Sequence, residues 1–252
     1  MECRNERDAR RCPVTARPPL RVFMGYDSRE PIAYHVASHS ILRHATEPIS
    51  ITPLALHSLK RFTRERGATE ATEFSFSRFM VPHLCNYEGL AVFMDSDMLV
   101  QCDLNELYLY TLADPGKAVW CVQHDYVPKD TVKMDGCVQT IYPRKNWSSF
   151  MVFDCSHPHS KWLTPDVVNT ETGKFLHRFE WTNDAHIGAL PLEWNWLVGE
   201  YEPNEDAKIL HYTNGGPWFC DREQCVNCDH ADLWTEEFER FAQPIALLSL
   251  EL

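Results

Sequence analysis

Short apolar runs bounded by polar, Gly or Pro residues recur along the chain and predict strands. The runs are rich in Val, Ile, Leu, Phe and Met, a composition typical of strands that are buried on both faces of a sheet. The predicted strands cover residues 21–26, 49–54, 90–94, 98–100, 118–122, 149–153 and 208–212.

Apolar residues three or four positions apart predict helices between these strands. One helix begins near Pro31, because a proline is favoured in the first helical turn. A second is predicted over residues 74–85 with a kink at Pro82, and Asp103 with Glu106 three residues later predicts a capped third helix. The predicted buried face of the second helix consists of Phe76, Phe79, Met80, His83 and Leu84.

The alternation of strands and helices favours an α/β fold of the Rossmann-like type, with a mostly parallel central sheet and helices on both of its faces. Residues 21–252 contain neither a repeat nor a linker rich in Pro and Gly, so we expect a single domain there. Residues 1–20 are rich in Arg and are predicted to be a disordered leader. Ligands of such sheets bind at the carboxyl ends of strands.

Composition narrows the possible partners. The chain has 252 residues, of which 44% are hydrophobic, and this is ample for a sizeable core. The formal net charge of −12 argues against a nucleic-acid partner, which requires a positive face. No stretch approaches the roughly 20 apolar residues of a transmembrane helix, and no signal-type apolar core is present. We therefore expect a cytoplasmic protein.

Five of the ten cysteines are scattered through strand-like or helical segments, which favours reduced thiols over a disulfide framework: Cys85, Cys102, Cys121, Cys137 and Cys155. Cys220, Cys225, Cys228 and His230 form the one dense group. Structural zinc is one interpretation of this group, although the usual zinc site has two well-separated ligand pairs. A surface loop that carries cysteines is the other.

Asp95 and Asp97 end the predicted strand 90–94, and they are the strongest candidates for chemistry. Residues i and i+2 of an extended chain point to the same side, so the two carboxylates can share one hard cation. Mg²⁺ and Mn²⁺ use a few protein carboxylates and take further ligands from substrate phosphates and water. The pair therefore predicts a site for a nucleoside diphosphate, and a turn without metal is the alternative.

His211, at the end of the predicted strand 208–212, is the best candidate for a third ligand. An imidazole shifts the preference from Mg²⁺ toward Mn²⁺. A histidine beside a strand can also be purely structural. The glycines Gly215 and Gly216 favour the ligand interpretation, because glycine lets backbone N–H groups approach a phosphate closely.

Five motifs in this order resemble the GT-A glycosyltransferases of the family-8 type, related to glycogenin and to bacterial galactosyltransferases. The resemblance spans residues 20–220 and is more specific jointly than any one motif. The motifs are Phe76-Ser77-Arg78-Phe79, Phe93-Met94-Asp95-Ser96-Asp97, Ser148-Ser149-Phe150-Met151-Val152-Phe153-Asp154, Leu190-Pro191-Leu192-Glu193-Trp194-Asn195 and His211-Tyr212-Thr213-Asn214-Gly215-Gly216-Pro217-Trp218.

The resemblance implies a GT-A fold and a metal-dependent transferase that moves a hexose from a UDP-sugar to an acceptor hydroxyl with retention of configuration. Mn²⁺, or Mg²⁺ in its place, would be held by Asp95, Asp97 and His211. Arg78 would bridge the donor sugar and the acidic motif, a surface ion pair being the alternative. The residues expected near the nucleotide or the donor are Gly25, Tyr26, Asp27, Ser96, Gly215, Gly216 and Trp218.

Thr182-Asn183-Asp184 falls where the family commonly has Asp-Gln-Asp. Asn183 would then lie near the anomeric carbon and Asp184 would bind sugar hydroxyls, while a helix N-cap is the alternative for Asp184. If the reaction inverts configuration, Asp184 or Asp154 is the candidate general base.

A second departure from the family is Gly216, which replaces its usual lysine and so removes a positive charge from the diphosphate. We expect the backbone amides of Gly215 and Gly216 to compensate. Two other functions stay open: a catalytically silent GT-A domain that binds sugars or nucleotides, and a nucleotide-sugar hydrolase.

Overall fold

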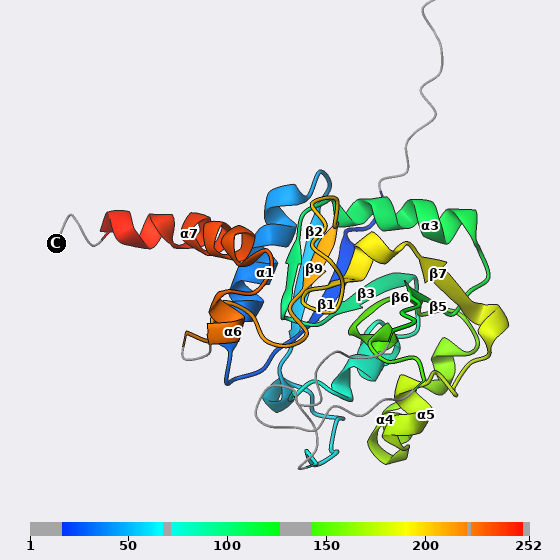
Figure 1. The fold of residues 1–252 in the computed structure, drawn as a ribbon. Coiled ribbons are helices and arrows are strands. Elements are labelled where there is room, and N and C mark those ends of the chain that lie inside the picture. The colour runs from blue at the N-terminus through cyan, green and yellow to red at the C-terminus, as the bar shows by residue number, and fades with distance from the viewer. Residues whose placement is uncertain (1–16, 68–71, 127–142, 221–222, 249–252) are drawn as a thin grey trace, which may run out of the picture.

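The computed structural model describes residues 17–67, 72–126, 143–220 and 223–248 (Figure 1). The predicted leader lies outside these ranges except for its last four residues, and Leu20 already belongs to the first strand. Among the described residues, none of the helices combines the length and the apolar character that crossing a bilayer requires.

A six-stranded sheet forms the centre of the domain, in the order β2-β1-β3-β6-β5-β7. Five of its strands run in one direction, and only β6 is antiparallel to its neighbours, so the prediction of a mostly parallel sheet is confirmed. Its strands are β1 (Leu20–Gly25), β2 (Ile49–Leu54), β3 (Leu90–Met94), β5 (Val119–Val122), β6 (Phe150–Asp154) and β7 (Ile187–Leu190).

Alternate residues of each strand enter two different cores, because successive side chains of a strand point to opposite faces. In β3, Ala91 and Phe93 join the core that contains Phe79 and Leu176, whereas Val92 and Met94 join the core that contains Ile41 and Leu107. Helices therefore cover both faces, as predicted. The α-helices of the described residues are α1 (Pro31–His44), α2 (Val81–Leu84), α3 (Leu107–Ala113), α4 (Pro165–Thr170), α5 (Gly173–His177), α6 (Glu223–Val226) and α7 (Ala231–Leu248).

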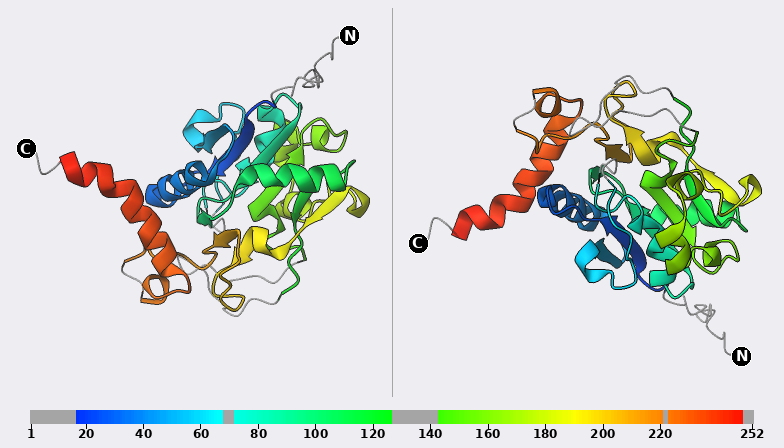
Figure 2. Two further views of the ribbon diagram at one scale, coloured as in Figure 1. Left: turned by 90° about the horizontal axis from the view of Figure 1, so that it is seen from above. Right: turned by 90° about the horizontal axis from the view of Figure 1, so that it is seen from below.

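A smaller sheet lies beside the central one and is the element that positions His211. Its order is β4-β9-β8, with bounds Met98–Val100, Ile209–His211 and Trp196–Leu197. The helix α7 packs against α1 and projects beyond the rest of the domain (Figures 1 and 2). Small sheet and helices meet in a third core, which includes Val36 of α1, Leu210 of β9 and Trp234 of α7.

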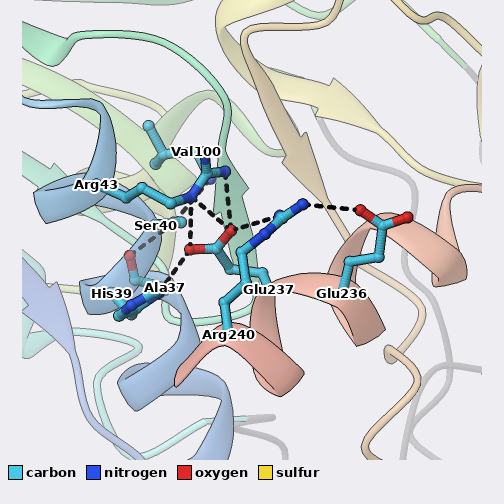
Figure 3. A network of polar contacts seen from close by, with 8 residues as sticks. All are labelled: Ala37, His39, Ser40, Arg43, Val100, Glu236, Glu237 and Arg240. Carbon is cyan, nitrogen blue, oxygen red and sulfur yellow. Dashed lines mark hydrogen bonds and ion pairs between the residues drawn. The ribbon is translucent and has the colours of Figure 1, made fainter. Parts of the chain in front are cut away.

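Glu237 links α7 to α1 at the centre of a polar network (Figure 3). Its side chain is 1% exposed and contacts Nδ1 of His39 at 2.6 Å, the Arg43 guanidinium at 2.8 Å and Arg240 Nη1 at 3.5 Å. Burial acts to raise the pKa of Glu237, but hydrogen bonds from Arg43 and His39 bring that pKa below its ordinary value. Glu237 is therefore a buried carboxylate that basic groups compensate fully.

The predicted helix over residues 74–85 is confirmed only over residues 77–84, and only its last turn is α-helical. A 3-10 helix covers Ser77–Met80 and a single α-helical turn follows at Val81–Leu84, so Pro82 lies in a first helical turn rather than at a kink. Phe76, Phe79 and Met80 are buried as predicted, while Leu84 is 39% exposed. The apolar pattern of Phe76, Phe79 and Met80 thus reflects their burial in the core rather than a regular α-helix.

The other two predicted helix starts are largely confirmed. Pro31 is the first residue of α1. The Asp103 side chain accepts a hydrogen bond from the backbone N–H of Asn105 and caps a 3-10 turn that leads into α3. Glu106 instead pairs with Lys208, so the capping box does not close.

Candidate metal and donor site

The site is built where β3 ends and β4 begins. Asp95 and Asp97 lie in the bend between these strands, and the backbone N–H of Asp95 donates to the carbonyl of Ser149 at 2.9 Å. Because β4 and β9 pair in antiparallel register with Met98 opposite His211, the ladder brings the imidazole to the acidic motif. His211 Nε2 lies 3.4 Å from Asp97 Oδ1.

One ligand atom each from Asp95, Asp97 and His211 lies within 4.8 Å of the other two, and the described residues contain no second group of this kind. His211 is 2% exposed, while the two carboxylates are partly accessible. Two hard carboxylates and one imidazole suit Mn²⁺ or Mg²⁺ and leave coordination positions for phosphate and water. The residues present thus fit a divalent cation.

A second layer of hydrogen bonds orients the His211 ring. Asn195 Nδ2 donates a hydrogen bond to Ser149 Oγ at 2.8 Å. Asn195 Oδ1 therefore faces His211 Nδ1 at 2.9 Å and accepts a hydrogen bond from the Nδ1–H group. Ser149 Oγ in turn donates to the carbonyl of Asn146 at 2.7 Å. This chain leaves Nε2 as the ring nitrogen toward Asp97, which is the usual arrangement of a metal-binding histidine.

Arg78 is an internal residue of the site rather than a surface ion pair. It is 6% exposed, and its Nη1 lies 3.0 Å from Asp95 Oδ1 and donates to the carbonyl of Ser148 at 2.8 Å. The guanidinium also lies over the Phe93 ring, 4.8 Å from its centre. Arg78 is thereby fixed against the acidic motif, in the position that the sequence predicts.

The loop after β1 carries the next three predicted residues. Gly25 ends β1, and a Cβ there would lie 2.4 Å from the Phe74 ring, so the position requires glycine. Tyr26 packs edge-on against Tyr34. Asp27 is 1% exposed and accepts hydrogen bonds from the N–H and the guanidinium of Arg29 and from the N–H of Glu73. Its carboxylate therefore holds the loop together, and a contact with a nucleotide stays a prediction.

The loop at 214–218 explains why glycine replaces lysine in this chain. A Cβ on Gly216 would lie 2.0 Å from the Trp218 ring, so no larger residue fits beneath the indole. The N–H of Gly215 donates to the carbonyl of Tyr212 at 2.8 Å and closes a turn. Gly215 therefore uses its amide within the protein, contrary to the expectation that both glycine amides face a phosphate.

Ser96, between the two aspartates, is 3% exposed. Asn183 and Asp184 are exposed and precede the amino end of β7, whereas Asp95 follows the carboxyl end of β3, which runs in the same direction. Asp184 is no N-cap, because its side chain, 85% exposed, pairs with Arg144. The structure does not bring the two residues into the metal group, and their role at the sugar stays a prediction.

Sequence reasoning missed Glu30 and Asn195. Glu30 is 8% exposed, and its Oε2 accepts a hydrogen bond from Trp218 Nε1 at 2.9 Å. Burial first, and the charge of Asp97 second, raise the pKa of Glu30 to about 7. Glu30 precedes Pro31 and resembles an ordinary helix-start residue, so the sequence carried no signal for it. The Trp-Asn pair of the fourth motif was such a signal for Asn195.

Cys220, Cys225, Cys228 and His230 do not converge on a common point within the described part of the chain. Cys225 Sγ donates to the carbonyl of Asn214 at 3.8 Å, and His230 Nε2 accepts from the N–H of Asn204 at 3.2 Å. This geometry does not support a zinc site, and the expected surface loop is only partly observed, because Cys225 is buried in α6.

Comparisons with known proteins agree with this architecture. No protein-family model matches the chain. The chain is 50% identical over 231 residues to Protein CDI from Arabidopsis thaliana, an alignment that covers 88% of this chain and 87% of that protein.

Three solved structures share the fold. The bifunctional glycosyltransferase WbbM superposes with a TM-score of 0.61 at 17% identity, over 89% of this chain and 50% of WbbM. The glycosyltransferase GlyE from Streptococcus pneumoniae gives 0.57 at 14% identity, over 92% and 64%. The galactosyltransferase LgtC, in complex with donor and acceptor sugar analogues, gives 0.54 at 11% identity, over 88% and 96%. The chain thus spans half of WbbM and less than two thirds of GlyE, but nearly all of LgtC.

These proteins share the fold of this chain, in which a central sheet has helices on both faces. In this chain the fold places Asp95 at a strand end. The chain therefore belongs to the family of Protein CDI from Arabidopsis thaliana, and its fold is that of the GT-A glycosyltransferases.

Proposed function

We propose that the protein is a metal-dependent glycosyltransferase that moves a hexose from a UDP-sugar to an acceptor hydroxyl. The observation that carries the proposal is the convergence of Asp95, Asp97 and His211, with Arg78 fixed beside them, on one edge of a GT-A sheet. Mn²⁺ is the favoured metal because one ligand is an imidazole. The assignment to family 8, retention of configuration and a cytoplasmic location stay predictions from the sequence.

The role proposed for each residue of the site follows from the position of its side chain. A divalent cation held by Asp95, Asp97 and His211 would neutralise negative charge on the departing nucleoside diphosphate. Asn195 keeps Nε2 of His211 directed toward this point. Arg78 offers a guanidinium fixed at Asp95, where its fork of donors stabilises charge that develops between the acidic motif and the sugar.

Calorimetric titration of UDP into the protein tests the donor site, first with Mn²⁺ and then with EDTA. We expect binding that requires the metal and that Asp97→Asn abolishes, since this change removes a ligand carboxylate. Asp114→Asn is the matched control, because Asp114 lies on the surface with its side chain 53% exposed. Binding that is equal in EDTA, or equal in Asp97→Asn, would contradict the proposal.

Turnover separates this proposal from its alternatives. A panel of UDP-sugars should be consumed only when a hydroxyl acceptor is present, with the sugar appearing on the acceptor. Cleavage that does not depend on an acceptor would identify a hydrolase. Metal-dependent binding without turnover over a broad panel would identify a silent domain, an alternative that the exposed position of Asp184 favours.

A further inference from the structure

Glu30 is a buried acid that the metal group does not use. It occupies the N-cap position of α1, yet its side chain makes no cap hydrogen bond to the helix. The carboxylate instead accepts the indole N–H of Trp218, a residue 188 positions away in the chain, at 2.9 Å. The side chain of Glu30 thus serves the loop at 214–218 rather than the start of its own helix.

Trp218 fixes the conformation of that loop. Its ring packs on Gly216 so closely that a Cβ there would lie 2.0 Å from a ring atom. The rings of Tyr212 and Trp234 flank it, with centres at 5.9 Å and 5.3 Å. Tyr212 follows His211 directly, and its carbonyl accepts the N–H of Gly215. The position of the indole is therefore coupled to the backbone next to the metal ligand.

A carboxylate is an unfavourable group to bury near Asp97 and a bound diphosphate, because like charges repel. Its presence is understandable when the protein needs a strong, rigid acceptor for the indole at this point. The short path from Glu30 through Trp218 to Gly216 joins the loop after β1 to the loop after β9. In the proposed function these two loops flank the nucleotide.

We propose that Glu30 is a positioning residue that holds Trp218 over Gly216 and so sets the shape of the loop that receives the donor diphosphate. The inference rests on the proposed function. Glu30 is not one of the metal ligands, and it acts on the loop through the indole.

The test compares Glu30→Gln, Glu30→Ala and Trp218→Phe in titrations of UDP with Mn²⁺. Gln keeps an oxygen acceptor, so we expect affinity equal to or higher than wild type. Glu30→Ala and Trp218→Phe each remove one partner of the hydrogen bond, and we expect affinity lower by about five- to tenfold. The double variant Glu30→Ala, Trp218→Phe should lose no more than either single variant, because both act on one contact.

Equal affinity in all variants, or losses that add in the double variant, would overturn the inference. Melting temperature is measured in parallel, and Trp218→Phe retains the aromatic packing should Glu30→Ala prove unstable. Amide hydrogen exchange over residues 212–219 without ligand is a second readout, expected to be faster in Glu30→Ala and unchanged in Glu30→Gln. If wild type binds no UDP, the proposed function fails, and unchanged exchange in Glu30→Ala would separately refute the role of Glu30.

Discussion

Acidic side chains with little exposure occur at two sites in this protein, and the surroundings of the two sites are opposite. Glu237 on α7 is matched by three basic partners, Arg43, His39 and Arg240, on α1 and α7 (Figure 3). At the end of β3, Asp95 and Asp97 lie close together with Glu30 nearby, and Arg78 Nη1 lies 3.0 Å from Asp95 Oδ1. An acid that basic side chains compensate stabilises the fold, whereas two acids that converge with a histidine form a set of ligands that suits a divalent cation.

Among the changes at these two sites, Glu237→Ala should lower the stability of the fold most. The change removes the hydrogen bonds of Arg43 and His39, whose side chains are 39% and 32% exposed and remain solvated, so we expect the free energy of unfolding to fall by about 1–3 kcal/mol. Chemical denaturation measures it. Glu236→Ala is the control, because Glu236 is 56% exposed and pairs with Arg240 on the surface, and it should cost less than about 1 kcal/mol.

The same measurement in EDTA should leave Asp97→Asn within about 1 kcal/mol of wild type, because removing one crowded carboxylate relieves repulsion while it loses the contact with His211. A loss as large as that of Glu237→Ala would mean that the acidic motif is structural. The contrast between the two sites would then disappear.

A sharper test of the metal site is Asn195→Ala. The change removes the acceptor that orients His211, and we expect affinity for Mn²⁺ to fall by about 10- to 100-fold, as outer-shell changes do in metal sites. Calorimetric titration with Mn²⁺ measures this. Asn195→Asp keeps an oxygen toward Nδ1 and should retain most of the affinity. Equal affinity in Asn195→Ala would show that His211 needs no orienting partner.

The smallest expected effect concerns acid stability. Because the pKa of Glu237 is lower in the folded state than its ordinary value of 4.5, its contribution to stability is present above that pH and is lost as the pH falls through the folded-state pKa. The difference in unfolding free energy between wild type and Glu237→Gln should therefore shrink from pH 7 to pH 3. A difference that is constant with pH would mean that the carboxylate is not ionised in the folded protein.

Much of the sheet followed from local pattern. β2 has the predicted bounds, β5 begins one residue later than predicted, β1 and β6 are shifted by one residue at both ends, and Asp95 lies at a carboxyl end as expected. Apolar runs of this kind are buried on both faces, so their pattern depends little on the partners. The helix predicted at 74–85 is shorter and half of it is a 3-10 helix, because Phe79 and Met80 reach the core from a 3-10 helix and Phe76 reaches it from the turn before.

The donor site was only partly accessible to sequence reasoning. The pairing of His211 with Asp97, which lies 114 positions earlier in the chain, was predicted and lies within ligand distance. Asp184 was assigned to the sugar site by a sequence motif. The position of this motif in space depends on the length of the segment before β7, and no local sequence pattern predicts that position. Glu30 was invisible because its partner Trp218 is 188 positions away.

Local sequence pattern thus determined five of the six strands of the central sheet, but not β7, and it determined which residue types could hold a cation, because hydrophobic periodicity and ligand chemistry are local properties. Tertiary structure alone decided that Arg78 is buried, that the Trp218 ring excludes a side chain at Gly216, and that Glu237 is compensated while Asp95 and Asp97 converge. These outcomes depend on distances between segments far apart in the chain, and such distances are set only when the two sheets and α7 pack together.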